Sequence, residues 1–138
     1  MATTSLVMST VMLIATSRYQ ARELIVASSL APVRITVGYP RFRLGYELAG
    51  SYAGLAPHGL LGKGLNEADF TRLYRLRLDE IGPETIQDEL CRLAGGRPGV
   101  VVLCFEDVIA GEGCHRRDFA TWWEERTGNE VAELGTLA

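Results

Sequence analysis

Chemically reactive side chains gather in one short stretch of this sequence, "VVLCFEDVIAGEGCHRRDFATWW", which runs from Val101 to Trp123. The stretch contains two thiols, an imidazole, carboxylates and two guanidinium groups, all within reach of one loop. Such groups can form a nucleophilic thiol, a metal site or an anion-binding site, or they can simply cap a helix. The residues concerned are Cys104, Glu106, Cys114, His115, Arg116 and Arg117.

The two arginines suggest an anion site at the start of a helix. The pattern predicts that a helix begins near Cys114, which places Arg116 and Arg117 in its first turn. Backbone N–H groups and the helix dipole favour negative charge there, so an arginine costs roughly a few tenths of a kcal/mol unless an anion offsets it. The sequence therefore predicts an external phosphate or carboxylate, with internal pairing as the alternative. The internal candidates are Glu106, Glu112 and Asp118.

Cys114 has the sequence surroundings of a reactive thiol. A helix N-terminus and neighbouring cationic side chains lower the pKa of a thiol and stabilise the thiolate. His115 could then transfer protons, and Glu106 could orient His115 or act as a base. Cys104 lies inside an apolar strand, where a small core residue is the simpler interpretation. The spacing from Cys114 to Arg117 does not match the longer phosphate loop of cysteine phosphatases, so that mechanism is not predicted.

A metal site would have to combine Cys104, Glu106, Cys114 and His115. Adjacent helical residues point about 100° apart, so Cys114 and His115 could share an ion only if Cys114 stays outside the helix. No fourth strong ligand lies nearby apart from acids, and we predict no metal and no cofactor. His115 also has a purely structural interpretation. It would share a helix side with Phe119, where a partly buried imidazole would bond to the backbone.

The elements that must position these residues alternate between strands and helices. Short apolar or β-branched runs predict strands, and capped amphipathic runs predict helices. Early strands joined by a helical crossover predict parallel pairing. The predicted fold class is α/β, a small three-layer sandwich with a mainly parallel, Rossmann-like sheet. We expect strands at 11–16, 33–38, 99–105 and 130–134, and helices at 20–28, 66–81, 83–94 and 114–127.

Ligands in such sheets bind beyond the carboxyl ends of the strands. Arg18 follows the first predicted strand, and Tyr39 and Arg41 follow the second. Arg77 interrupts the apolar face of its helix and could point into the same cleft. Residues 39–65 contain six glycines and two prolines without a sustained period. Such a segment predicts a functional lid or a ligand-facing surface, with a solvated loop as the alternative.

Length and composition fit one ordinary globular domain. The chain has 138 residues, 47% of them hydrophobic, and a net charge of -3. No general attraction to nucleic acid or acidic membranes is expected, so any polyanion binding must be local. The three cysteines form no spaced framework, which favours a reduced, cytoplasmic chain. The apolar run near the N-terminus is too short to span a bilayer, and we expect a disordered leader over 1–10 and one α/β domain over 11–138.

A buried strand ending in "LCFE", a short loop, and "CHRR" opening the last helix resemble the C-terminal signature of the family known as domain of unknown function 488. That family occurs in bacteria and their phages. "FTRLYRLRL", residues 70–78, is similar to a helix of the family, and "ATSRYQ", residues 15–20, to its first strand. The resemblance implies the α/β fold and an important site, without a particular reaction. It carries over to Cys104, Glu106, Cys114, His115 and Arg116, and further to Tyr74 and Arg75.

The sequence thus predicts a cytoplasmic protein that binds a phosphate-bearing ligand, a nucleotide or a nucleic-acid end, with a thiol-dependent activity. Cys114, His115 and Glu106 are the predicted catalytic residues. The alternative is a non-enzymatic, phage-type accessory factor that binds a protein partner through residues 39–65. The sequence is compatible with a homodimer, and no membrane partner is expected. The predicted ligand-binding residues are Arg116, Arg117, Arg18, Arg41, Tyr39, Cys104, Tyr74 and Arg77.

Overall fold

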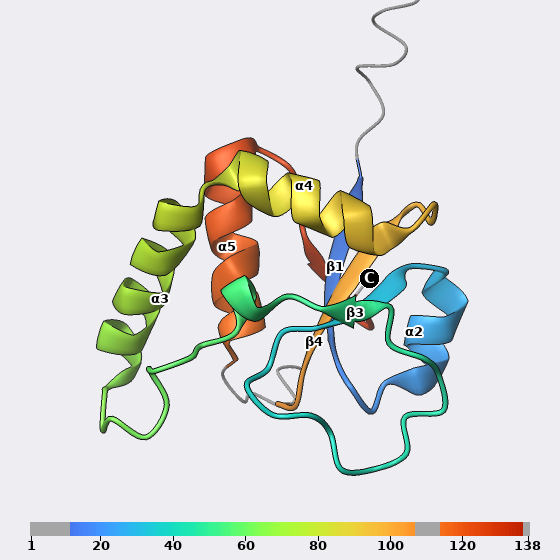
Figure 1. The fold of residues 1–138 in the computed structure, drawn as a ribbon, viewed down its shortest axis with the longest axis horizontal. Coiled ribbons are helices and arrows are strands. Elements are labelled where there is room, and N and C mark those ends of the chain that lie inside the picture. Colours follow the sequence, from blue (N-terminus) through green and yellow to red (C-terminus); the bar gives the residue numbers. More distant parts are fainter. Residues whose placement is uncertain (1–11, 107–113, 137–138) are drawn as a thin grey trace, which may run out of the picture.

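In the computed structural model, which describes residues 12–106 and 114–136, the chain forms a five-stranded, all-parallel sheet with helices on both faces (Figure 1). This arrangement confirms the predicted three-layer α/β fold. The strands are β1 (Leu13–Arg18), β2 (Ala31–Arg34), β3 (Gly50–Ser51), β4 (Gly99–Cys104) and β5 (Ala132–Glu133). The helices are α2 (Arg22–Ser28), α3 (Glu67–Ile81), α4 (Pro83–Ala94) and α5 (His115–Thr127), with a 3-10 helix η1 (Ala53–Leu55).

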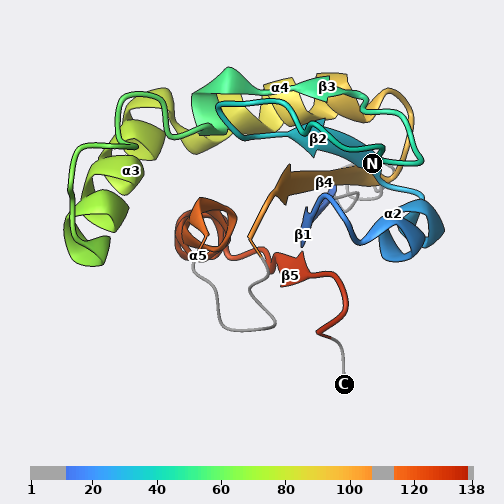
Figure 2. The same ribbon diagram turned by 90° about the horizontal axis from the view of Figure 1, so that it is seen from below.

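β4 lies at the centre of the sheet, whose strand order is β3-β2-β4-β1-β5. Every residue of β4 is buried, as expected for a continuous apolar run that is covered on both faces. Helix α2 covers one face, and α4 and α5 cover the other (Figure 2). Helix α3 packs against α5 beside the sheet. Helix α5 therefore lies between the sheet and α3.

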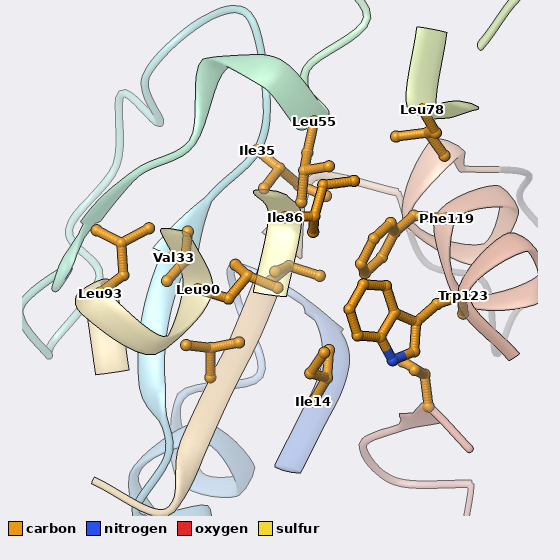
Figure 3. Close-up of a cluster of buried hydrophobic side chains, with 14 of the residues drawn as sticks. Ile14, Val33, Ile35, Leu55, Leu78, Ile86, Leu90, Leu93, Phe119 and Trp123 are labelled. Atoms are coloured by element: carbon orange, nitrogen blue, oxygen red, sulfur yellow. The ribbon is translucent and has the colours of Figure 1, made fainter. Parts of the chain in front are cut away.

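The larger hydrophobic core lies between the sheet and the α4 and α5 helices (Figure 3). Val33 of β2 meets Ile86 and Leu90 of α4, and Phe119 and Trp123 extend the same cluster from α5. Each such side chain contributes about 1.5–3 kcal/mol when it leaves water. This packing fixes α5 against the sheet and thereby fixes the position of its first turn.

The helix boundaries follow local capping signals. The Asn66 side chain accepts a hydrogen bond from the N–H of Asp69, which satisfies one of the free donors at the start of α3. Gly82, with a φ of 91°, separates α3 from α4, and Pro83 then occupies the first turn of α4. The predicted helices over 66–81 and 83–94 are confirmed.

The first half of the chain departs from the prediction at the second strand. β2 ends at Arg34, four residues before the predicted end, although the N–H of Ile35 still donates to the Leu103 carbonyl at 3.3 Å. The Arg34 guanidinium donates to the carbonyls of Thr36 and Val37 at 2.6 and 3.1 Å and so bonds the segment that follows the strand. Residues 39–65 contribute β3 and η1, which were not predicted since elements of two or three residues carry no periodic signal.

Two side chains of α3 hold this long segment in place. The Tyr74 hydroxyl donates to the Leu55 carbonyl at 2.6 Å. The Arg77 guanidinium donates to the carbonyls of Ala56 and His58 at 3.0 and 2.6 Å. The expectation that Arg77 points into a ligand cleft is therefore corrected: its charge binds backbone oxygens of the loop.

The predicted leader and the start of the first predicted strand precede the residues that the structure describes. The expected leader, residues 1–10, lies outside the described residues. None of the described helices combines the length and the apolar character that crossing a bilayer requires. The predicted last strand is shorter than expected, and it forms β5 at an edge of the sheet.

Candidate active site

The reactive residues of the stretch from Val101 to Trp123 meet where β4 ends and α5 begins. Cys104 is the last residue of β4, Cys114 caps α5, and His115 is the first residue of that helix. They adjoin a pocket of about 460 Å³ that two of them, Cys114 and His115, help to line. The other lining residues are Leu61, Leu65, Glu67, Phe70, Thr71, Glu106, Arg117 and Asp118.

Cys114 takes the position that serine or aspartate usually occupies at a helix start. Its backbone is extended, with φ -155° and ψ 142°, so it lies outside the helix that it caps. Its sulfur accepts a hydrogen bond from the N–H of Arg116 at 3.5 Å. The sulfur therefore faces the positive end of the helix dipole, which favours a thiolate.

His115 is held in one orientation by the backbone. Its Nε2 lies 2.7 Å from the carbonyl oxygen of Ile35, so Nε2 carries a proton and donates it to that oxygen. Nδ1 is then the nitrogen that faces Cys114, at 3.9 Å from the sulfur. The ring is 8% exposed and contacts the edge of Tyr74 at 5.6 Å between centroids. The structural interpretation, a buried histidine bonded to the backbone, is confirmed, and it leaves Nδ1 available for proton transfer.

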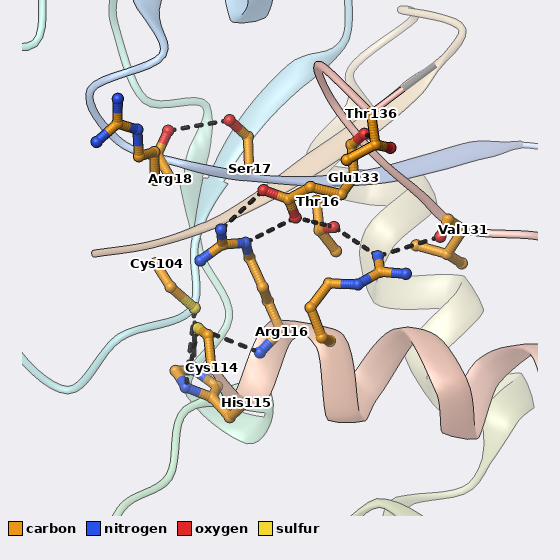
Figure 4. A network of polar contacts seen from close by, with 11 residues as sticks. Thr16, Ser17, Arg18, Cys104, Cys114, His115, Arg116, Val131, Glu133 and Thr136 are labelled. Carbon is orange, nitrogen blue, oxygen red and sulfur yellow. Dashed lines mark hydrogen bonds and ion pairs between the residues drawn. The ribbon is translucent and has the colours of Figure 1, made fainter. Parts of the chain in front are cut away.

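Cys104 lies against the face of the same imidazole (Figure 4). Its sulfur is 3.4 Å from Nε2 and 3.8 Å from Nδ1 of His115. Nearly equal distances to both nitrogens place the sulfur over the ring, because a position in the ring plane would clash with ring carbons. Cys104 is fully buried, as a small core residue would be.

Three atoms in this cluster have the chemistry of metal ligands. The two sulfurs and a nitrogen of His115 lie within 4.8 Å of one another. Cys114 also lies outside the helix, which is the condition under which it could share an ion with the adjacent His115. A metal bound to Nδ1 would lie in the plane of the ring, whereas Cys104 lies over its face. A shared ion therefore requires the side chains to turn.

The two thiols have opposite acid strengths. Burial opposes ionisation of Cys114, but hydrogen bonds from Cys104 and His115, the charge of His115 and the N–H of Arg116 together bring its pKa well below that of a free thiol. Burial raises the pKa of Cys104, and the neighbouring Cys114 sulfur raises it further. Cys104 therefore keeps its proton and donates it toward the Cys114 thiolate.

Glu106 is half-buried and lines the pocket beside Cys114. Burial and the negative charge of Cys114 raise the pKa of its carboxyl, which makes Glu106 able to hold or accept a proton near the thiol. The predicted role of orienting His115 is filled by the Ile35 carbonyl instead.

Arg116 is fully buried and engaged inside the protein. Its Nε and one terminal nitrogen donate to Glu133 at 2.9 and 2.7 Å, and Thr16 donates to the same carboxylate at 2.6 Å. Its remaining nitrogen has no hydrogen-bond partner and points toward the sulfur of Cys104 (Figure 4). The predicted place of Arg116 in an external anion site is corrected, because its charge is neutralised by Glu133. The internal partner was not among the three acids predicted, of which Glu112 lies outside the described residues.

Arg117 lines the pocket and also forms hydrogen bonds to the sheet. One guanidinium nitrogen donates to the Thr16 hydroxyl at 2.8 Å and to the Val131 carbonyl at 3.2 Å. Among the residues that the structure describes, three carboxylates line the same pocket against this one arginine. They belong to Glu67, Glu106 and Asp118.

Arg18 and Tyr39, two of the other predicted ligand-binding residues, do not line this pocket. Arg18 lines a different pocket, together with Arg22 and Arg43. Tyr39 is exposed, and the Arg34 guanidinium stacks on its ring at 3.7 Å. The predicted convergence of the strand ends on one anion site is therefore not what the fold produces.

Three more predicted residues do not line the pocket either. Arg41 is exposed on the surface segment that follows β2. Tyr74 lies fully buried beneath His115 and is bonded to the loop. Arg75, which the family resemblance singled out, forms an ion pair with Glu125 of α5.

Comparison with family models, with curated proteins and with solved structures found no match to this chain. The resemblance to the domain of unknown function 488 family stays a prediction.

Proposed function

We propose that this protein is a thiol-dependent enzyme in which Cys114 is the nucleophile and His115 transfers its proton. One observation carries the proposal: the Cys114 sulfur faces Nδ1 of His115 at 3.9 Å, while Nε2 is fixed by the Ile35 carbonyl at 2.7 Å. A base beside a thiol, with a third group that orients the base, is the recurring arrangement of nucleophilic catalysis. The sulfur to nitrogen distance is long for a hydrogen bond, as is common before a substrate binds.

The proposed reaction is transfer of a group through a covalent bond to Cys114. The thiol proton moves to Nδ1, and the thiolate attacks an electrophilic atom of the substrate. His115 then returns the proton to the leaving group, and water or another acceptor takes the group from the sulfur. Glu106, at the same pocket, is placed to hold a proton for this second step.

The pocket favours a ligand with an apolar part and little negative charge. Leu61, Leu65 and Phe70 supply apolar surface, and carboxylates outnumber guanidinium groups among the lining residues within 12–106 and 114–136. Repulsion among like charges opposes a phosphate there. The predicted phosphate ligand accordingly stays outside the proposal and is given its own test.

We expect alkylation of Cys114 by iodoacetamide to change by less than about twofold between about pH 6 and about pH 8. A thiol whose pKa is lowered is already thiolate over that range, whereas a free thiol with a pKa of about 8.5 reacts roughly 70 times faster at the higher pH. The measurement is the labelling rate by mass spectrometry in the Cys91→Ser variant, because Cys91 is exposed and would also react.

Glutathione, labelled in the same solution, is the control for the reagent. Each rate is measured with and without a chelator, since an ion on the sulfur would slow labelling until it is removed. If the Cys114 rate rises with pH as steeply as that of glutathione, Cys114 is not the nucleophile. The non-enzymatic accessory factor would then be the better description of the protein.

We expect no nucleotide to raise the Tm of this protein by the mass action that binding produces. The reason is the excess of carboxylates in the pocket and the pairing of Arg116 with Glu133. The measurement is thermal unfolding against a panel of mono-, di- and triphosphates. A rise in Tm that Arg117→Ala removes would restore a phosphate-bearing ligand to the proposed function.

A further inference from the structure

The two sulfurs at the site differ in their access to solvent. Cys114 lines the pocket, whereas Cys104 is fully buried behind it. Their sulfur atoms lie within 4.8 Å of each other, side by side next to the imidazole of His115 (Figure 4). A disulfide has a sulfur to sulfur distance of about 2.05 Å, so the atoms need to approach by at most about 2.8 Å.

We infer that Cys114 and Cys104 form a reversible disulfide when a peroxide enters the pocket, which switches the site off. The inference rests on the proposed reactivity of Cys114 and adds a regulatory modification to the same site. Cys114 is the residue that a peroxide can reach, and Cys104 is the residue that can only react afterwards.

The chemistry balances with hydrogen peroxide as the oxidant. The Cys114 sulfur attacks one peroxide oxygen, an S–O bond forms, the O–O bond breaks, and hydroxide leaves to become water. The sulfur of Cys114 is thereby oxidised to a sulfenic acid. The Cys104 sulfur then attacks it, the S–S bond forms, the S–O bond breaks, and the second oxygen leaves as water with the Cys104 proton.

The backbone on the two sides of the pair is held differently. The carbonyl of Cys104 accepts the N–H of Tyr19 at 2.9 Å, and the strand continues into the centre of the sheet. Cys114 lies outside α5 and is held from the first turn of that helix: its sulfur accepts the N–H of Arg116, and its carbonyl accepts the N–H of Arg117 at 3.0 Å. Closure of the disulfide is therefore expected to move Cys114 toward Cys104, which withdraws the nucleophile from the pocket.

The test treats the Cys91→Ser variant with a small excess of hydrogen peroxide. We expect the intact mass to fall by two hydrogen atoms, both iodoacetamide-reactive thiols to disappear, and a digest to yield a peptide pair joined through Cys104 and Cys114. Dithiothreitol should restore both thiols. A disulfide found only between two molecules would overturn the inference.

The matched control is the double variant Cys91→Ser, Cys104→Ser, which removes one sulfur atom and keeps the size of the side chain. With no partner for the oxidised Cys114, dimedone should trap a sulfenic acid in this variant and not in the parent. Thermal unfolding shows whether the variant is folded, and Cys104→Ala serves as a second replacement at the same position. Equal dimedone trapping in parent and variant would also overturn the inference.

A second oxidant separates this inference from the proposed function. Diamide converts adjacent thiols to a disulfide without requiring attack on a peroxide. Disulfide formation with diamide, together with slow alkylation at about pH 6, would contradict the proposed nucleophile and retain the adjacency of the cysteines. Fast alkylation with no disulfide under either oxidant would retain the nucleophile and overturn the switch.

Discussion

Glu133→Gln is expected to lower the free energy of unfolding by about 3–5 kcal/mol. The carboxylate of Glu133 accepts two hydrogen bonds from the fully buried Arg116 and one from Thr16. The amide keeps one oxygen, but it removes the negative charge and turns an N–H₂ group toward the guanidinium. A buried charge without a partner is costly, and total stabilities of domains are only about 5–15 kcal/mol.

Urea unfolding at neutral pH measures this effect, and Glu130→Gln is the matched control. Glu130 is exposed in the segment before β5, so its change should stay within about 0.5 kcal/mol. The double variant Arg116→Met, Glu133→Leu removes both charges and is expected to be more stable than Glu133→Gln alone. A Glu133→Gln protein as stable as the Glu130→Gln protein would mean that the Arg116 charge finds another partner.

His115→Asn is expected to slow alkylation of Cys114 at about pH 6.5 by at least roughly 10-fold. The hydrogen bond and the positive charge of the imidazole both lower the pKa of the Cys114 thiol, so their loss raises it, while the hydrogen bonds from Cys104 and from the N–H of Arg116 remain. Asparagine is neutral and cannot accept the thiol proton, and its shorter side chain also gives up the hydrogen bond from Nε2 to the Ile35 carbonyl.

The control for this prediction is His58→Asn, in an exposed part of the loop before α3. It should leave the alkylation rate unchanged. Thermal unfolding of both variants separates a loss of reactivity from a loss of fold. Alkylation of the His115→Asn variant at the original rate would assign the low thiol pKa to Cys104 and the helix N-terminus, and would make His115 a structural residue.

The parts of the fold that could be predicted are those with local chemical signals. An asparagine cap, a glycine stop and a proline start define α3 and α4, and the apolar run of residues 99–104 defines the central strand. β3 and η1 could not be predicted, because two or three residues show neither period nor capping. Their place is set by tertiary bonds, such as that from Tyr74 to the Leu55 carbonyl.

The residues of the candidate site also fall into those that the sequence could predict and those that it could not. Cys114 and His115 could be recognised because they are adjacent and lie at a predicted helix start. The group that orients His115 could not be recognised, since it is the backbone carbonyl of Ile35, 80 residues away in the sequence. Glu133 was missed for a related reason. It lies in a two-residue strand, and its partnership with Arg116 depends on β5 joining the sheet beside β1.

Both edges of the sheet are formed by strands of only two residues, β3 and β5. An edge strand exposes unpaired backbone groups that can recruit a strand from another molecule, and long, flat edges are the ones that aggregate. Two residues offer too short a ladder to hold an incoming strand. The truncated edges therefore protect this parallel sheet from growing by addition of further chains.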